Sequence, residues 1–323
     1  MAKAKKHKFD FVDLFAGVGG VRLPFTLSGG TCVLTSEIDY GALTTYGANF
    51  KDVKKHRLVG DVTKIADADI PSHDLLLAGF PCQAYSLAGL RKGLNDPRGK
   101  LFLEIIRFLQ EKAPKVFLLE NVKGLVSHEG GATFKFILDE LQRCGYHIHW
   151  KVMNTMKYGN VPQTRERVYL VGFRNDVDSS HFEFPEEIPL TKTVSDCLEV
   201  GKVDDKYYYD GRYSCFDGIA SEVSQKGVIY QWRRRYVRKN KSGVCPTLTA
   251  NMGSGGHNVP LVLDNYGIRK LTPRECARFQ GFPESFVLPN MSDSRLYRQF
   301  GNSVSVPVIA RVADKILEVL CHH

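Results

Sequence analysis

The stretch Asp74-Leu-Leu-Leu-Ala-Gly-Phe-Pro-Cys-Gln83 decides the fold. Its apolar run, Leu75 to Phe80, predicts a short buried strand that ends at Pro81, because proline has no backbone N–H to donate to a sheet. Cys82 therefore lies just past the strand end. In open α/β sheets, ligands and catalytic groups collect at the carboxyl edge of the strands, so this thiol is a candidate nucleophile. Taken alone, Cys82 is more typical of a small buried hydrophobic residue, and it is the neighbouring residues that favour a nucleophile.

The segment from Gln83 to Gly99 predicts a mobile lid next to Cys82. It holds three glycines, three basic side chains and Pro97, a composition that is typical of loops that close over a bound substrate.

Composition limits the class of protein. The chain has 323 residues, of which 43% are hydrophobic, and no apolar run approaches the length of a membrane span. Its eight cysteines are scattered without a Cys-x-x-Cys pair, so we expect free thiols and no metal site. A formal net charge of +9 favours a polyanionic partner.

The residues before this stretch predict a nucleotide-type cofactor site. A strand over Phe9–Phe15 leads into the turn Ala16-Gly17-Val18-Gly19-Gly20, whose glycines let the backbone approach a ligand. Glu37 follows about twenty residues later, after a strand over Thr31–Thr35, at the spacing where a carboxylate meets ribose hydroxyls. Asp61 follows a third apolar segment. The pattern is not Gly-x-Gly-x-x-Gly, so an adenosine-type cofactor is favoured over a nicotinamide dinucleotide.

The residues after it predict a continued alternation of helices and strands. Helices are expected over 101–111 and 133–144, and strands over 115–119, 146–152 and 168–173. Glu120 directly follows one of these strands, which predicts a carboxylic acid on the same edge as Cys82. Arg165 and Arg167 alternate at the strand period, so both are expected to face one side and to pair with carboxylates or phosphates.

Beyond Arg174 the pattern becomes irregular, which indicates a smaller second domain. Its centre, residues 231–241, interleaves six positive side chains with Trp232 and Tyr236 and precedes a Gly-rich loop that ends at Gly256. Clustered Arg and Lys with polar loops favour contacts to nucleic acid. Thr272, Pro273 and Glu275 then predict a helix start, and an apolar helix runs to Leu320.

The sequence therefore predicts an α/β protein with a Rossmann-like sheet and a smaller irregular domain. We expect a catalytic and cofactor-binding domain over 1–190, a recognition domain over 191–272, and a hinge with a C-terminal helix over 273–323 that returns to the first domain.

Six segments, in order and across nearly the whole chain, resemble the cytosine-5 DNA methyltransferases of bacterial restriction–modification systems. They are Asp13-Leu-Phe-Ala-Gly-Val-Gly-Gly20, Gly79-Phe-Pro-Cys-Gln83, Glu120-Asn-Val122, Gln163-Thr-Arg-Glu-Arg167, Arg274-Glu-Cys-Ala-Arg278 with Gly281-Phe-Pro283, and Gly301-Asn-Ser-Val304.

The resemblance implies a fold for S-adenosylmethionine-dependent methyl transfer and a specific mechanism. Cys82 is expected to add to carbon 6 of a flipped-out cytosine, while Glu120, kept protonated by burial, donates to ring nitrogen 3. Arg165 and Arg167 are expected to steady the base oxygen and the acid. Carbon 5 then takes the methyl group of S-adenosylmethionine.

The resemblance also assigns contact residues. Residues expected to bind S-adenosylmethionine are Phe15, Gly17, Gly19, Gly20, Glu37, Ile38, Asp61, Pro81, Leu101, Asn302 and Ser303. Residues expected to contact DNA are Gln83, Ala88, Arg98, Arg233, Arg234, Arg235, Arg238 and Thr247. Two positions depart from the family pattern: Ala88 replaces a serine that enters the duplex in some relatives, and Ile38 replaces an aromatic residue that packs on adenine.

The expected partner is double-stranded DNA in the bacterial cytoplasm, with the enzyme associated with the nucleoid through DNA. The enzyme is expected to be a monomer, without membrane association, and to work alongside a restriction endonuclease without a stable complex. Three alternatives stay open: a tRNA-directed cytosine methyltransferase, an inactive DNA-binding relative, and a nicotinamide-dependent oxidoreductase.

Overall fold

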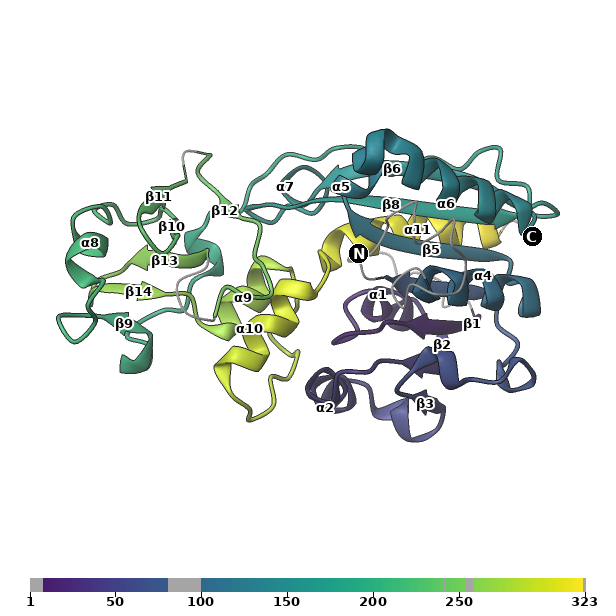
Figure 1. Ribbon diagram of the computed structural model, residues 1–323, viewed down its shortest axis with the longest axis horizontal. Coiled ribbons are helices and arrows are strands. Elements are labelled where there is room, and N and C mark those ends of the chain that lie inside the picture. Colours follow the sequence, from purple (N-terminus) through teal and green to yellow (C-terminus); the bar gives the residue numbers. More distant parts are fainter. Residues whose placement is uncertain (1–7, 81–99, 241, 254–257, 322–323) are drawn as a thin grey trace. The chain divides into compact units, whose positions relative to one another are not determined.

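The computed structural model describes residues 8–80, 100–240, 242–253 and 258–321 (Figure 1). The chain forms two compact units, each built from segments that are separated in the sequence. The first unit consists of Met1–Met153, Glu166–Glu186 and Ile309–His323, and the second of Asn154–Arg165 and Glu187–Val308.

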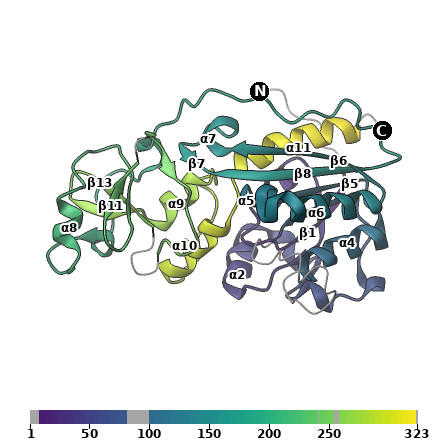
Figure 2. The same cartoon turned by 45° about the horizontal axis from the view of Figure 1, so that its top comes forward.

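The first unit is built on a seven-stranded sheet, which confirms the predicted α/β class. Its strands, in spatial order, are β3 (Arg57–Val59), β2 (Thr31–Ser36), β1 (Asp10–Leu14), β4 (Leu75–Gly79), β5 (Val116–Val122), β8 (Glu166–Arg174) and β6 (Tyr146–Asn154). The pairs from β3 to β5 are parallel, and β8 runs antiparallel to β5. Figure 2 shows β5, β8 and β6 side by side.

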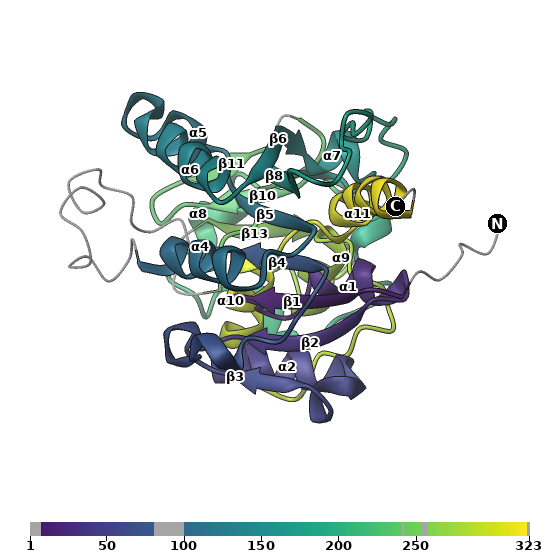
Figure 3. The same cartoon turned by 90° about the vertical axis from the view of Figure 1, so that its right-hand side faces the viewer.

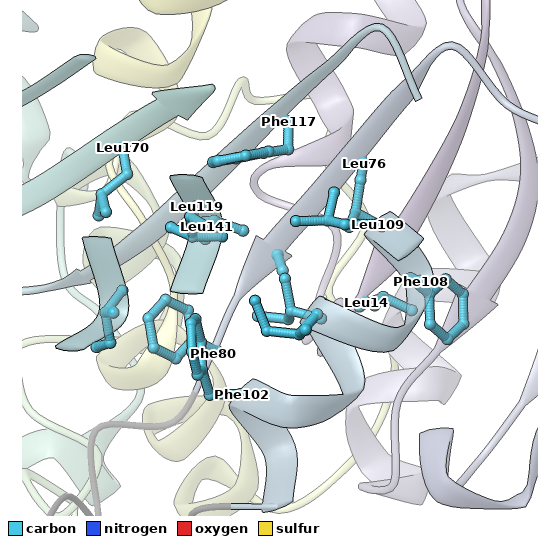
Figure 4. Packing of buried hydrophobic residues seen from close by; sticks show 14 of the residues in the cluster. Leu14, Leu76, Phe80, Phe102, Phe108, Leu109, Phe117, Leu119, Leu141 and Leu170 are labelled. Atoms are coloured by element: carbon cyan, nitrogen blue, oxygen red, sulfur yellow. The ribbon is translucent and has the colours of Figure 1, made fainter. Parts of the chain in front are cut away.

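Helices cover both faces of this sheet (Figure 3). On one face, α4 (Lys100–Lys112) and α6 (Ala132–Arg143) bury Phe102, Leu109 and Leu141 against sheet residues such as Leu76 and Leu119 (Figure 4). The apolar residues of α4 recur at helical spacing, which places them on one stripe. On the other face, α1 (Arg22–Leu27) packs Phe25 against Phe11 of β1, and α11 (Val306–Cys321) lies alongside. The unit also contains α2 (Tyr40–Asn49) and α5 (Gly124–Ser127).

One predicted boundary was wrong. The strand expected over 115–119 is β5, which extends to Val122, so Glu120 lies inside the strand rather than after it. The extension follows from pairing with β8, because Glu120 lies opposite Tyr169 and Val122 lies opposite Arg167. Cross-strand pairing of this kind depends on a distant segment, which a local apolar run does not reveal.

The second unit is built on a five-stranded antiparallel sheet. Its strands, in spatial order, are β11 (Val237–Lys239), β10 (Tyr230–Trp232), β13 (Val259–Leu263), β14 (Ile268–Lys270) and β9 (Tyr208–Tyr209). A separate parallel pair joins β7 (Gln163–Thr164) to β12 (Cys245–Pro246). The helices are α7 (Thr155–Tyr158), α8 (Phe216–Ala220), α9 (Pro273–Phe279) and α10 (Asp293–Asn302).

The predicted helix start at Thr272 is confirmed. Its hydroxyl accepts from the backbone N–H of Glu275, and the Glu275 carboxylate accepts from the N–H of Thr272, so the two groups form a capping box ahead of α9. Across the part of the chain that the structure describes, no helix is long and apolar enough to span a membrane.

Candidate active site

The carboxyl ends of four parallel strands meet at one edge of the first unit's sheet. Leu14 of β1 lies opposite Ser36 of β2 and Ala78 of β4, and Gly79 of β4 lies opposite Glu120 of β5. From β1 the chain proceeds to β2 and β3 on one side and then crosses to β4 and β5 on the other. Such a reversal between β1 and β4 opens the crevice in which ligands bind in doubly wound sheets.

Two glycines of the turn after β1 have different physical roles. Both have positive φ, 55° at Gly17 and 84° at Gly19, following Phe15 at 54°. A Cβ on Gly19 would lie 2.2 Å from the ring of Phe50, so packing requires a glycine there. A Cβ on Gly17 would meet no described atom within 4 Å, so the backbone at Gly17 is open to a ligand.

The carboxylate of Glu37 links the end of β2 to the glycine turn through hydrogen bonds. Its Oε2 accepts from the N–H of Gly17 at 2.7 Å, and its Oε1 accepts from the N–H of Asp39 at 2.7 Å. Beside it, Ile38 and Tyr40 are 77% and 80% exposed, so both present apolar surface to solvent. Tyr40 was not predicted as a site residue; the sequence signal was an aromatic residue three positions after a strand-end carboxylate.

Asp61 caps the short 3-10 helix Val62–Lys64 at the end of β3. Its Oδ1 accepts from the side chain of Thr63 at 2.8 Å and from its N–H at 3.0 Å, and these bonds lower the pKa of the Asp61 carboxyl. The carboxylate is therefore ionised near neutral pH and available as an acceptor. Phe15 and Leu101, two other predicted cofactor contacts, are half-buried against the core under α4, and Gly20 is buried.

A buried polar network lies beneath the glycine turn. The guanidinium of Arg22 stacks 4.2 Å from the centre of the Phe50 ring, pairs with Asp52, and donates to the hydroxyl of Tyr46 at 2.8 Å. That hydroxyl donates to Oδ2 of Asp13 at 3.0 Å. Because Phe50 in turn packs on Gly19, the network stabilises the conformation of the glycine turn. Its members are far apart in sequence, and none was singled out from the sequence for this role.

Asp13 makes stability depend on pH. Burial raises the pKa of its carboxyl from 3.8 to about 7, so the folded chain keeps a proton that the unfolded chain releases. The contribution of the protonated carboxyl to the free energy of unfolding is therefore present at low pH and is lost as pH rises towards 7. We expect Asp13→Asn to remove this dependence. Between pH 5 and pH 8 the wild-type protein should lose roughly 3 kcal/mol of unfolding free energy that the variant does not lose. Urea unfolding at the two pH values measures the difference, and a constant difference between the proteins would contradict the assignment.

Glu120 and Arg167 form the central ion pair of the edge. Arg167 Nε lies 3.1 Å from Glu120 Oε1, and the two side chains are 13% and 11% exposed. By contrast, the Glu166 side chain is 41% exposed and pairs with Lys123 at 3.0 Å.

Asn121 fixes the backbone that leads to the candidate nucleophile. Its Nδ2 donates to the carbonyl of Phe80 at 3.0 Å, and its Oδ1 accepts from the N–H of Val122. Phe80 is buried and packs near Phe102 of α4. Asn121 was not predicted as a site residue, although its place after Glu120 was the available signal. Five predicted residues lie outside the described part of the chain: Pro81, Cys82, Gln83, Ala88 and Arg98.

Arg165 and Arg167 have different described partners. Arg165 lies between β7 and β8, is 2% exposed, and donates to backbone carbonyls of the second unit, among them that of Leu248 at 3.1 Å. Arg167 pairs with a carboxylate of the first unit, as expected. The simple alternation of a strand does not hold here, because the chain leaves β7 at Thr164 and enters β8 at Glu166.

The predicted basic residues of the second unit lie on one hairpin. β10 and β11 are joined by residues 233–236, and Arg233, Arg234, Arg235 and Arg238 are all exposed. Arg234 has a φ of 63°, which turns the chain at the tip. Arg233 donates to Asn258 at 2.9 Å and Arg238 to Gln231 at 2.8 Å. This hairpin places clustered positive charge on an exposed surface.

The remaining predicted residues also lie in the second unit. Thr247 is half-buried, and its hydroxyl donates to the carbonyl of Thr164 at 2.6 Å. At the end of α10, Asn302 is exposed and Ser303 is 9% exposed. Among the described residues, no group of three or more His, Cys, Asp or Glu side chains is arranged to hold a metal ion.

Comparison with known proteins identifies the family. The model of the C-5 cytosine-specific DNA methylases matches residues 9–318. The chain is 50% identical over 307 residues to the type II methyltransferase M.Bsp6I of Bacillus sp. (strain RFL6), covering 94% of this chain and 96% of that relative. It is 39% identical to the type II methyltransferase M.HpaII of Haemophilus parainfluenzae, covering 98% of this chain and 91% of that relative.

A solved structure agrees on the fold. The S. pombe Dnmt2 methyltransferase superposes with a TM-score of 0.75 at 22% identity, covering 97% of this chain and 99% of that one. The sheet, the family match and the relatives together decide against a nicotinamide-dependent oxidoreductase. The chain belongs to the C-5 cytosine-specific DNA methylases and is a bacterial DNA (cytosine-5)-methyltransferase of the restriction–modification type.

Proposed function

We propose that this enzyme methylates carbon 5 of a cytosine that has been flipped out of a short specific duplex sequence, through a covalent bond from Cys82 to carbon 6. The observation that carries the proposal is the buried Glu120–Arg167 pair, at 3.1 Å, beside the β4 segment that leads to Cys82. Asn121 binds the carbonyl of Phe80, two residues before the thiol, and so fixes the backbone just after the end of β4.

The roles of the side chains follow from the chemistry of cytosine. Carbon 5 is a weak nucleophile until the Cys82 thiolate adds to carbon 6 and the ring becomes an enamine. Negative charge that develops on the ring is neutralised when protonated Glu120 donates to ring nitrogen 3. Arg167, which pairs with Glu120, is proposed to hold the acid in place and to donate to the base oxygen. Loss of the carbon 5 proton and departure of Cys82 restore the ring.

The strand edge of the first unit fits the adenosine part of S-adenosylmethionine. Gly17 leaves space for close approach, Glu37 offers carboxylate oxygens to ribose hydroxyls, and Asp61 presents an ionised acceptor. Ile38 and Tyr40 offer exposed apolar surface to the adenine ring. The bound cofactor supplies an electrophilic methyl group on its sulfonium centre. Asn302 and Ser303 are proposed as contacts from the family resemblance alone.

Glu37 gives a direct test of this cofactor site. We expect Glu37→Gln to weaken binding of S-adenosylhomocysteine by about 10-fold or more, because hydrogen bonds to charged acceptors contribute roughly 1.5–3 kcal/mol. Isothermal titration calorimetry measures the change. The matched control is Glu111→Gln, at an exposed position of α4 that has no role in the site. Equal affinity in wild type and Glu37→Gln would remove Glu37 from the cofactor site.

The exposed hairpin of the second unit fits the DNA backbone. Arg233, Arg234, Arg235 and Arg238 are proposed to contact phosphates, which position the protein, while neighbouring loops read base edges. Thr247 is proposed to pack on the target strand. Gln83, Ala88 and Arg98 are proposed to close over the flipped base and fill its vacated space.

The cellular role is proposed from the type II relatives. We expect a monomer that acts in the cytoplasm, associated with the nucleoid, and protects one short sequence from a partner restriction endonuclease without forming a stable complex with it. Transfer of tritiated methyl groups from S-adenosylmethionine to duplex DNA tests the proposed function, with tRNA as the control substrate. Label in tRNA but not in DNA, or in neither, would contradict it.

A further inference from the structure

Gln163 and Arg165 are polar side chains buried inside the second unit. Gln163 is fully buried and Arg165 is 2% exposed. A buried amide or guanidinium is costly unless its polar atoms are hydrogen-bonded, so the partners of these groups show what they hold in place. Their described partners lie in three segments that are distant in sequence: Leu248, Phe279–Gln280 and Gly301–Ser303.

The two side chains hold one peptide segment from both sides. Oε1 of Gln163 accepts from the N–H of Leu248 at 3.1 Å, and Nη1 of Arg165 donates to the carbonyl of Leu248 at 3.1 Å. Both backbone polar groups of Leu248 are therefore bound by side chains that are two residues apart. The preceding residue, Thr247, is bound as well, because its hydroxyl donates to the carbonyl of Thr164 at 2.6 Å.

The same side chains also hold the ends of α9 and α10. Nη2 of Arg165 donates to the carbonyls of Gly301 and Ser303, and Nε2 of Gln163 donates to the carbonyl of Phe279. Gly301 lies directly against the segment after Leu248, since a Cβ on Gly301 would lie 2.3–2.4 Å from backbone atoms of Thr249 and Ala250. The segment 247–250 is thus fixed between β7 and α10, with little room to shift.

We propose that Arg165 and Gln163 are positioning residues that set the conformation of segment 247–250 for binding of the specific DNA sequence. Arg165 acts through this segment and not on the target base, a role that belongs to Arg167 with its carboxylate partner. The inference rests on the proposed function, in which Thr247 packs on the target strand. Both terminal nitrogens of Arg165 bond backbone carbonyls, which orients its guanidinium into the unit.

Positioning and catalytic roles of Arg165 predict different measurements. A group that touches the base in the transition state lowers the rate at saturating DNA when it is removed. A group that shapes the DNA-binding segment lowers affinity for the specific duplex. Non-specific affinity, which comes from phosphate contacts, is retained because the exposed hairpin at 233–238 is unchanged.

The test compares Arg165→Gln with wild type, using a duplex that carries the methylation site and an equally long duplex that lacks it. We expect the Kd for the specific duplex to rise by about 10-fold or more, and the Kd for the other duplex to stay within about twofold. Arg165→Lys retains the charge and some donors and should recover part of the affinity. The control is Arg278→Gln, which removes a surface pair with Glu284 and should bind as wild type does.

The outcomes distinguish failure of the positioning role of Arg165 from failure of the proposed function. An unchanged Kd for the specific duplex in Arg165→Gln, or an equal loss on both duplexes, would overturn the inference. Thermal unfolding of each variant accompanies the binding measurements, and Arg165→Lys keeps the test valid if Arg165→Gln does not fold. A wild-type enzyme that binds both duplexes equally and methylates neither would contradict the proposed function itself.

Discussion

Cys82→Ala will abolish methyl transfer while DNA binding survives. Without the thiolate there is no addition to carbon 6, and carbon 5 stays too weak a nucleophile to take the methyl group. We expect the rate to fall by at least about 10⁴-fold, as is usual when a covalent nucleophile is removed. Single-turnover transfer of tritiated methyl, with DNA affinity measured in parallel, tests this result.

A matched cysteine variant controls for nonspecific effects of losing a thiol. Cys321 is exposed at the end of α11, so Cys321→Ala should transfer methyl groups at the wild-type rate. Measurable turnover in Cys82→Ala would remove Cys82 from the role of nucleophile. Loss of DNA binding in the same variant would mean that the residue matters for structure rather than for chemistry.

Glu120→Gln will have the second largest effect. The amide keeps the size of the side chain and can still accept a hydrogen bond from Arg167, but it has no acidic proton for ring nitrogen 3. We expect a loss of roughly 10²–10⁴-fold in the single-turnover rate, the usual contribution of a general acid. Affinity for S-adenosylhomocysteine and for DNA should stay within about threefold of wild type.

Glu166→Gln is the control for this experiment. Glu166 also pairs with a cation, Lys123, but its side chain is 41% exposed and such surface pairs contribute little. Its rate should match wild type. A Glu120→Gln enzyme that retains the wild-type rate would show that another group protonates the base.

Local sequence patterns predicted the architecture of the first unit. Strand positions followed from apolar runs bounded by glycines and carboxylates, whereas the spatial order that places β1 between β2 and β4 is known only from the structure. The placement of Glu37 and Glu120 at the carboxyl edge was predictable because each comes from a short, strongly apolar segment. These signals are local, and local signals are the ones that a single sequence carries.

The features that were missed depend on residues that meet only in the folded chain. The contact of Asp13 with Tyr46 joins residues 33 positions apart, and the contact of Arg165 with Leu248 joins residues 83 positions apart. Periodicity predicted that Arg165 and Arg167 share a side, but the chain passes from one compact unit to the other between Arg165 and Glu166. The second unit likewise combines Asn154–Arg165 with Glu187–Val308, and the irregular pattern beyond Arg174 gives no sign that Asn154–Arg165 belongs to it.

Bisulfite sequencing of plasmid DNA from hosts that express the wild-type chain or Cys82→Ala tests the central claim most directly. The account predicts that protected cytosines cluster at one short sequence in plasmids from the wild-type host and are absent from plasmids of the variant host. Protection at the same sequence in both hosts, with both proteins folded, would contradict a mechanism that depends on Cys82.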